Sequence, residues 1–316
     1  MSCLDEAVIT SPEQMLKAPR ASALRSLRWT HLELTHQLQD ELQLDAPMAL
    51  GTLFRSVWGL ALHQRSAQAF ELLFGPSQET YRPGWWSPPD IGHDIRIAAG
   101  RQLVSRLSLQ DLAWPHLGAC LDAVADFGVL GLGSQRVRAD LRQVRLLGPD
   151  GASPLHQGVR GAQWDGLEAW QSALREATGW EHESPMRVCA RTPLRLKDQG
   201  LPLQQAPSLQ TWVLRCMGRV QMLLPEGSGA LLEAADKQAW LEHCDGMPAQ
   251  GVSLWQQRVP RYSARQQQAM QIGGLCGSWS YPARGRRAWP WLRLAEHLQL
   301  GGKTTLGFGA VQVQGP

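Results

Sequence analysis

Nine histidines are the first candidates for proton transfer in this chain of 316 residues, because imidazole titrates near neutral pH. Three of them, His31, His36 and His63, fall close together in the sequence, around one predicted strand and the helix that follows it. The six cysteines contain no CxxC pair, which disfavours a structural zinc site. The sequence therefore offers acid–base chemistry and gives no motif for a metal or another cofactor.

A lysine inside a glycine-rich stretch is the clearest candidate for binding phosphate. Lys303 is one of four lysines and stands within GGKTTLGFG at 301–309. A point charge within such a loop suits a phosphate group, and a simple strand entry is the alternative. A P-loop would require a glycine at position 297, which is a histidine, so ATP binding is disfavoured. The loop residues expected to contact phosphate are Gly301, Gly302, Lys303, Thr304, Thr305, Gly307 and Gly309.

Charge is distributed unevenly along the chain. Residues 1–184 hold 16 basic and 21 acidic side chains, residues 185–316 hold 15 and 7, and residues 246–316 hold 8 and 1. An end this basic predicts a polyanionic partner. Its arginines are interleaved with aromatic residues, which suits RNA binding, although a solvated basic loop around buried tryptophans would look the same. These arginines are Arg258, Arg261 and Arg265 in one strand region, and Arg284, Arg286 and Arg287 in a predicted hairpin loop.

Hydrophobic periodicity predicts the elements that position these residues in the first half of the chain. The helix begins at Gly51 and ends near His63–Arg65, and the stretch 76–92 is rich enough in Pro, Gly and Trp to predict a loop. The order strand–helix–strand–helix–strand indicates a ferredoxin-like half. The other predicted elements are a strand at 25–36, a strand within 102–113, a helix at 115–127 and a strand within 128–147.

The second half repeats this order of elements, so the fold class is predicted to be α+β with two tandem ferredoxin-like domains. Strands are expected at 186–196, over 252–281, where a glycine bend interrupts them, and after the glycine-rich loop. Gly273 and Gly274, at the start of GGLCGSW, are expected to contact the RNA. Helices are expected at 209–224 and 289–301, and His297 on the latter is expected at the surface. The predicted divisions are 1–150 for the first domain, 151–184 for a linker and a helix, and 185–316 for the second domain.

No apolar run reaches the roughly 20 residues that span a bilayer. The first residues, MSCLDEAVITSPEQ, are acidic and polar and do not resemble a signal peptide. We therefore expect a soluble cytoplasmic protein with no membrane partner.

Five stretches, taken in order, resemble one known family. They are GTLFRSVWGLAL (51–62), GLGSQRVRADLRQV (131–144), TPLRLKDQG (192–200), RYSARQQQAMQIGGLCGSW (261–279) and GGKTTLGFGAV (301–311). In this order they resemble the RAMP-type CRISPR precursor-RNA processing endoribonucleases, the sixth family of Cas proteins. The resemblance implies two ferredoxin-like domains facing each other across an RNA-binding cleft. It also implies cleavage of CRISPR repeat RNA without a metal, and partners that include the guide RNA and other subunits of a Cas effector complex.

The resemblance also implies a chemistry. The 2′-hydroxyl of the RNA attacks the adjacent phosphate, one group removes its proton, another protonates the leaving 5′-oxygen, and positive charge stabilises the phosphate. The products would be a cyclic phosphate and a 5′-hydroxyl. The family's catalytic histidine often lies on or just after the first helix, which favours His63. His36 and His31 are the next candidates, on opposite faces of the strand if it is regular, and Arg55 is a candidate where a histidine is not used.

One departure from the family pattern leaves an alternative open. The family usually pairs its histidine with an upstream tyrosine or histidine, and the three tyrosines here, Tyr81, Tyr262 and Tyr281, are far from His63 in the sequence. The alternative is a non-catalytic guide-RNA-binding subunit of a CRISPR effector complex. A backbone RAMP subunit, or another ferredoxin-like interaction module, is a third possibility.

Overall fold

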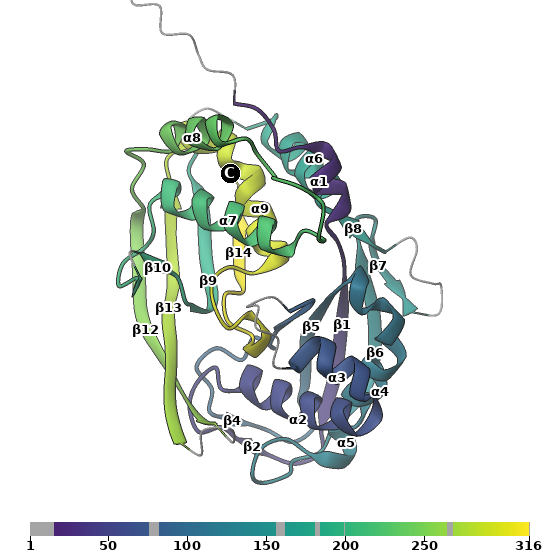
Figure 1. The fold of residues 1–316 in the computed structure, drawn as a ribbon. Coiled ribbons are helices and arrows are strands. Elements are labelled where there is room, and N and C mark those ends of the chain that lie inside the picture. Colours follow the sequence, from purple (N-terminus) through teal and green to yellow (C-terminus); the bar gives the residue numbers. More distant parts are fainter. Residues whose placement is uncertain are drawn as a thin grey trace, which may run out of the picture.

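The first half of the chain forms an antiparallel sheet covered on one face by helices (Figure 1). A computed structural model describes residues 16–75, 82–155, 162–180, 184–198, 200–263 and 268–315. The strands lie in the order β3-β5-β1-β6-β7, and β8 also pairs with β1. The elements of this half are β1 (Arg28–Leu38), β2 (Leu42–Gln43), α2 (Leu50–Arg65), α3 (Ala67–Phe74), β3 (Gly84–Ser87), β4 (Arg96–Ile97), β5 (Gln102–Gln110), η1 (Asp111–His116), α4 (Leu117–Ala125), α5 (Phe127–Leu130), β6 (Ala139–Gly148) and β7 (Gly151–Pro154).

The second half builds a second antiparallel sheet in the order β12-β13-β9-β14. Its two longest strands form a hairpin that runs along one side of the molecule (Figure 1). The elements are β9 (Met186–Leu194), β10 (Lys197–Asp198), β11 (Leu201–Pro202), α7 (Leu209–Leu223), α8 (Ala234–His243), β12 (Gln250–Ser263), β13 (Gln268–Tyr281), η3 (Ala283–Ala288), α9 (Trp289–Leu298), η4 (Thr304–Leu306) and β14 (Val311–Gln314).

Both halves have the same topology. In the first, β3, β5, β1 and β6 are the second, third, first and fourth main strands of the chain; in the second, β12, β13, β9 and β14 have the same ranks. Helices connect the first strand to the second and the third to the fourth in each half. This is the β-α-β-β-α-β arrangement of the ferredoxin-like fold, so the predicted fold class is confirmed.

The segment between the two halves contributes to both. The short strand β8 (Trp164–Asp165) pairs with β1 of the first sheet. The helix expected within 151–184 is α6 (Gly166–Ala177), which packs against α9 and against α1 (Ala21–Ser26). The Asp165 side chain accepts a hydrogen bond from the Glu168 amide and so caps the start of α6.

Two expectations about local structure were wrong. The stretch 76–92, predicted to be a loop, contains β3, whose Trp85 and Trp86 are both 1% exposed. Proline and glycine dominate its composition and hide a strand of four residues. The PARGRR segment is not a hairpin loop, because Ala283–Ala288 form a 3-10 helix that leads directly into α9.

Three clusters of buried apolar side chains hold the molecule together. One lies beneath the helices of each half, and the third lies where the halves meet. The third contains Ala49, Val259, Ile272, Leu306 and Phe308. No helix within the described residues is long and apolar enough to cross a bilayer.

Gly51 in α2 allows a close approach between the halves, and it provides a test of this packing. A Cβ at this position would lie 2.6 Å from the Leu306 carbonyl oxygen. We predict that Gly51→Ala lowers the free energy of unfolding by about 1–3 kcal/mol through overpacking, although alanine is the better helix former. Chemical denaturation of the purified variant measures this.

The matched control is Gly118→Ala in α4, where no heavy atom lies within 4 Å of the added Cβ. It should leave stability unchanged or raise it by up to ~1 kcal/mol. If both variants were equally stable, the contact between α2 and Leu306 would not be tight.

Candidate functional site

The glycine-rich loop at 301–309 is tied to the end of β9 by backbone hydrogen bonds. The amides of Gly302 and Gly309 donate to the carbonyl oxygens of Arg195 and Pro193, at 3.0 and 3.1 Å. Gly309 has a φ of +75°, and a Cβ there would collide with the Leu300 carbonyl oxygen, so glycine is required. The loop is therefore a fixed part of the second domain.

Most of the described loop amides donate within the protein. Leu306 donates to the Lys303 carbonyl at 2.9 Å and Gly307 to that of Thr304 at 3.0 Å. The exposed Lys303, in the left-handed conformation with a φ of +69°, is the charged side chain that the loop itself presents to solvent. Contact between this loop and a phosphate would therefore depend on Lys303 more than on an amide nest.

The other side of the loop meets the first domain. Leu306 and Phe308 are buried against Ala49, which directly precedes α2, and against Val259 and Ile272 of the β12–β13 hairpin. The loop thus lies at the junction of three parts of the fold, the start of α2, the end of β9 and the hairpin.

The basic residues singled out in the sequence do not form one cluster with this loop. In the β9–β13 register Leu194 pairs with Leu275 near the loop, whereas Met186 pairs with Tyr281 next to η3. Eight residues of strand separate these ends by about 26 Å. Arg284, Arg286 and Arg287 of η3 therefore lie near the opposite end of β9 from Lys303.

The remaining predicted RNA contacts divide between the hairpin and residues that cannot be placed. Arg258 is exposed on β12. Arg261 belongs to β12, but its side chain lies outside the described residues, as does Arg265 altogether. Gly273 and Gly274 have a structural role, because Cβ atoms there would collide with the carbonyl oxygens of Gln257 and Leu194.

His63 lies at the far end of α2 from the loop. Twelve residues separate it from Gly51, which corresponds to about 18 Å along a helix. Its exposed imidazole packs edge-on against Phe70, with ring centroids 4.7 Å apart. Arg55, one turn beyond Gly51, places its guanidinium 4.4 Å from the centre of the Phe74 ring. The structure therefore does not bring His63 to the glycine-rich loop.

His36 points into the core of the first domain, on the face of β1 opposite to that of His31. Its ring stacks on Phe127 at 5.1 Å and meets the edge of Phe54 at 5.6 Å. Burial lowers the pKa of His36 to about 4. In this structure His36 is a core residue that has no surface on which to meet a substrate.

His31, which is buried, and His297, which is partly buried, form a pair across the two domains. His31 Nε2 accepts a hydrogen bond from Trp29 Nε1 at 3.0 Å and lies 3.2 Å from His297 Nδ1, and His31 Nδ1 lies 2.7 Å from Ser108 Oγ. Since an indole nitrogen only donates, His31 carries its proton on Nδ1 and His297 donates from its own Nδ1.

This hydrogen bonding keeps both imidazoles neutral. Protonating His31 would place an N–H opposite two other donors. Burial, helped by Arg106, lowers the pKa of His31 well below its ordinary value and that of His297 to about 3. The expectation that His297 lies at the surface was wrong, because the Trp29 and Trp164 rings cover it, at 5.6 and 4.5 Å.

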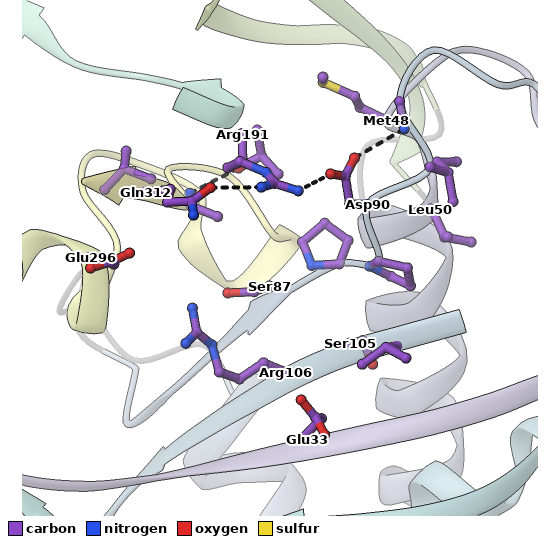
Figure 2. Close-up of a pocket in the computed structure, with 18 of the residues that line it drawn as sticks. Glu33, Met48, Leu50, Ser87, Asp90, Ser105, Arg106, Arg191, Glu296 and Gln312 are labelled. Atoms are coloured by element: carbon purple, nitrogen blue, oxygen red, sulfur yellow. Dashed lines mark hydrogen bonds and ion pairs between the residues drawn. The ribbon is translucent and has the colours of Figure 1, made fainter. Parts of the chain in front are cut away.

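Two features near the domain junction were not anticipated from the sequence. The exposed His93 lies beside Trp255 of β12, with ring centroids 5.3 Å apart. Next to it, Arg191 of β9 forms an ion pair with Asp90 and donates to Gln312 Oε1 at 2.8 Å (Figure 2). Neither feature follows a sequence motif, because each pairs residues about 100 or more positions apart.

Comparisons with known proteins agree with this arrangement. Residues 188–311 match the family model of the CRISPR-associated endoribonuclease Cas6, a range that runs from β9 into the start of β14. The sequence resemblance to that family is therefore confirmed over this region. No curated protein is similar enough in sequence to count as a relative.

Solved structures share the fold of nearly the whole chain. A Cas6 product complex has a TM-score of 0.56 and 15% identity, covering 91% of this chain and 100% of the other. A Thermus thermophilus Cas6 has a TM-score of 0.55 and 14% identity, covering 90% and 98%. A partial Cas6-RT-Cas1–Cas2 complex has a TM-score of 0.62 and 11% identity, covering 95% of this chain and 47% of the other.

The buried His36 provides a test by pH. Its pKa is lowered in the folded protein, so acid protonates the unfolded chain first, and stability falls as the pH drops below about 6.5. With a folded pKa of about 4, the loss between pH 7 and pH 4 is about 3 kcal/mol from this residue alone. We predict that His36→Leu matches wild type near pH 7 and loses less stability in acid.

Urea denaturation at several pH values measures this difference. His31 and His297 stay in place in the variant, so its acid sensitivity is reduced without being abolished. A variant with the same slope of stability against pH as wild type would contradict the burial of His36.

Proposed function

We propose that this chain is an endoribonuclease that cuts CRISPR repeat RNA in precursor transcripts to produce guide RNA. The observation that carries the proposal is the match of residues 188–311 to the Cas6 family model, because this region contains the glycine-rich loop and the hairpin beside it. The tandem ferredoxin-like fold and the excess of basic residues near the end of the chain support it. Solved structures with this fold include a Cas6 product complex.

The proposed reaction needs no metal. The 2′-hydroxyl attacks the neighbouring phosphate, a base accepts its proton and an acid protonates the departing 5′-oxygen, which leaves a cyclic phosphate and a 5′-hydroxyl. The product would stay bound through contacts to its phosphates. Lys303 and Arg258, exposed on the loop and on the hairpin, are the proposed phosphate contacts among the described residues.

His63 remains the first proposed proton-transfer residue and His93 becomes the second. Both are exposed, and His93 is favoured by its place beside Trp255 of the β12–β13 hairpin. His36 and His31 are buried. We do not extend the proposal to these two, because a buried imidazole cannot contact an RNA strand unless the fold opens.

The proposal predicts cleavage in EDTA. Purified protein incubated with the repeat RNA from its own array should make one cut, and a 2′-deoxy nucleotide on the 5′ side of the scissile phosphate should abolish the cut while binding persists, because the nucleophile is missing. Gel analysis of end-labelled RNA measures both. Cutting of the deoxy substrate would contradict 2′-hydroxyl attack.

The two histidines are then compared as His63→Ala and His93→Ala. Loss of general acid–base catalysis should slow the cut by about 10²–10⁴-fold at unchanged affinity. If neither variant slowed it, neither histidine would transfer the proton.

The non-catalytic subunit remains the second candidate. Tyr281 donates a hydrogen bond to the Pro207 carbonyl at 2.9 Å and is buried in the second domain, so it cannot pair with either exposed histidine. Tight binding of repeat RNA without any cut would favour this candidate.

Lys303 gives a test of RNA binding that is independent of cleavage. A single lost phosphate contact reduces the slope of log affinity against log salt by about 0.7 for single-stranded RNA. We predict this change for Lys303→Ala and no change for Lys237→Ala, an exposed lysine on α8. Filter binding across a salt series measures the slopes, and equal slopes would remove Lys303 from the interface.

A further inference from the structure

A cavity of about 350 Å³ lies between the two domains, and its floor is the face of the first sheet that the helices leave uncovered (Figure 2). Glu33 of β1 and Arg106 of β5 rise from that floor into the space. Arg191 and Gln312 of the second sheet form the opposite wall, and Glu296 of α9 closes one side. The two domains therefore enclose a polar space to which each contributes.

Arg106 is the unusual member of this lining. It is largely buried, and burial lowers its pKa, an effect that Glu296 and Glu33 oppose through their charge. Across the parts of the chain that the structure describes, its guanidinium makes no hydrogen bond and no ion pair within 4.0 Å. Its neighbours are engaged elsewhere, Glu33 with Arg145 at 3.2 Å and Glu296 with Arg293.

A guanidinium has five N–H donors. Those of Arg106, a partly buried side chain, have no acceptor within the described residues. Arg106 is the direct cross-strand partner of Glu33 in the β1–β5 register, yet it does not pair with it. Instead both side chains point into the cavity (Figure 2). The floor thus presents a fork of donors without a protein acceptor, next to a carboxylate that Arg145 contacts through one oxygen, Oε1.

The charges of the cavity argue against a phosphate in this place. Glu33, Asp90 and Glu296 line it together with Arg106 and Arg191, and Arg191 is already held by Asp90. A phosphodiester anion would face three carboxylates in a partly desolvated space, where such repulsion is strong. A neutral, planar group with both acceptors and donors fits better.

We propose that this cavity takes up a single guanine base from a single-stranded part of the RNA, with Arg106 donating to O6 and N7 and Glu33 accepting from N1–H and the exocyclic amine. The inference rests on the proposed function only in that the ligand is RNA. Guanine is the base that offers two neighbouring acceptors on one edge and two neighbouring donors on another.

The apolar part of the lining suits the faces of a base. Pro88, Pro89, Ile91 and Val104, the last of them 47% exposed, also line the space. The exposure of Val104 and of Asp90 shows that the cavity opens to solvent. A splayed base can enter by this route while its phosphates remain outside, as in the recognition of unstacked RNA bases by other proteins.

The test uses four short RNAs that need no knowledge of the repeat, namely U₉ and the same nonamer with G, A or C at its centre. Fluorescence anisotropy with wild-type protein should show the G oligomer binding at least 10-fold more tightly than U₉, since a bidentate base contact is worth about 1–3 kcal/mol. Arg106→Gln should bind all four equally, at the affinity of wild type for U₉.

Arg106→Lys separates charge from geometry, because it keeps the charge and loses the fork. It too should lose the preference for G, with its U₉ affinity unchanged. The matched control is Arg187→Gln, which removes an exposed arginine of β9 that does not line the cavity. It should keep the preference for G, with any change in affinity the same for all four oligomers, and thermal unfolding establishes that each variant is folded.

Three results would overturn the proposal. They are a wild-type protein that binds the four RNAs equally or prefers A, C or U, a G preference that survives in Arg106→Gln, and no binding of any nonamer by a protein that cuts its repeat RNA. Failure of the proposed function is a different result, in which repeat RNA stays uncut while the G preference and its loss in Arg106→Gln are both observed.

Discussion

The contact between the glycine-rich loop and the start of α2 determines how the two domains sit against each other. Leu306 and Phe308 of the loop pack on Ala49, and the backbone of Gly51 passes so close to the Leu306 carbonyl that no side chain fits between them. The loop is tied to Arg195 and Pro193 at its other side. The loop that we propose to bind phosphate therefore also forms the packing contact between the two domains.

This contact between the loop and α2 explains why polar groups lie between the domains. Once the open face of the first sheet is turned toward α9, His31 meets His297 and Arg106 meets the cavity. The histidine pair satisfies its own hydrogen bonds and is neutral, so its burial is tolerable. Arg106 is partly buried and has no such partner among the described residues. For this reason we propose a ligand at Arg106 and none at the histidine pair.

The sequence predicted the elements well where hydrophobic periodicity reflects burial within one domain. The helix from Gly51 and the strand from 186 follow that periodicity, and the order of elements led to the correct fold class. It failed for β3, because two buried tryptophans lie among prolines and glycines, and for His297, because periodicity within a helix does not show which face another domain covers. The cavity could not be predicted from the sequence either. It exists because the packing of the two domains brings together Glu33, Arg106 and Arg191.

The same reasoning bears on where RNA chemistry can occur. A proton-transfer residue must be exposed to the RNA strand and lie near the groups that hold its phosphates. The position of a histidine in the sequence shows neither its exposure nor its nearness to those groups. His63 is exposed but about 18 Å along α2 from Gly51, whereas His93 is exposed beside Trp255 at the domain junction. If a base is held at Arg106, its strand leaves the cavity at an exposed rim that includes Asp90, three residues before His93. That position favours His93 over His63 as the residue that meets the strand.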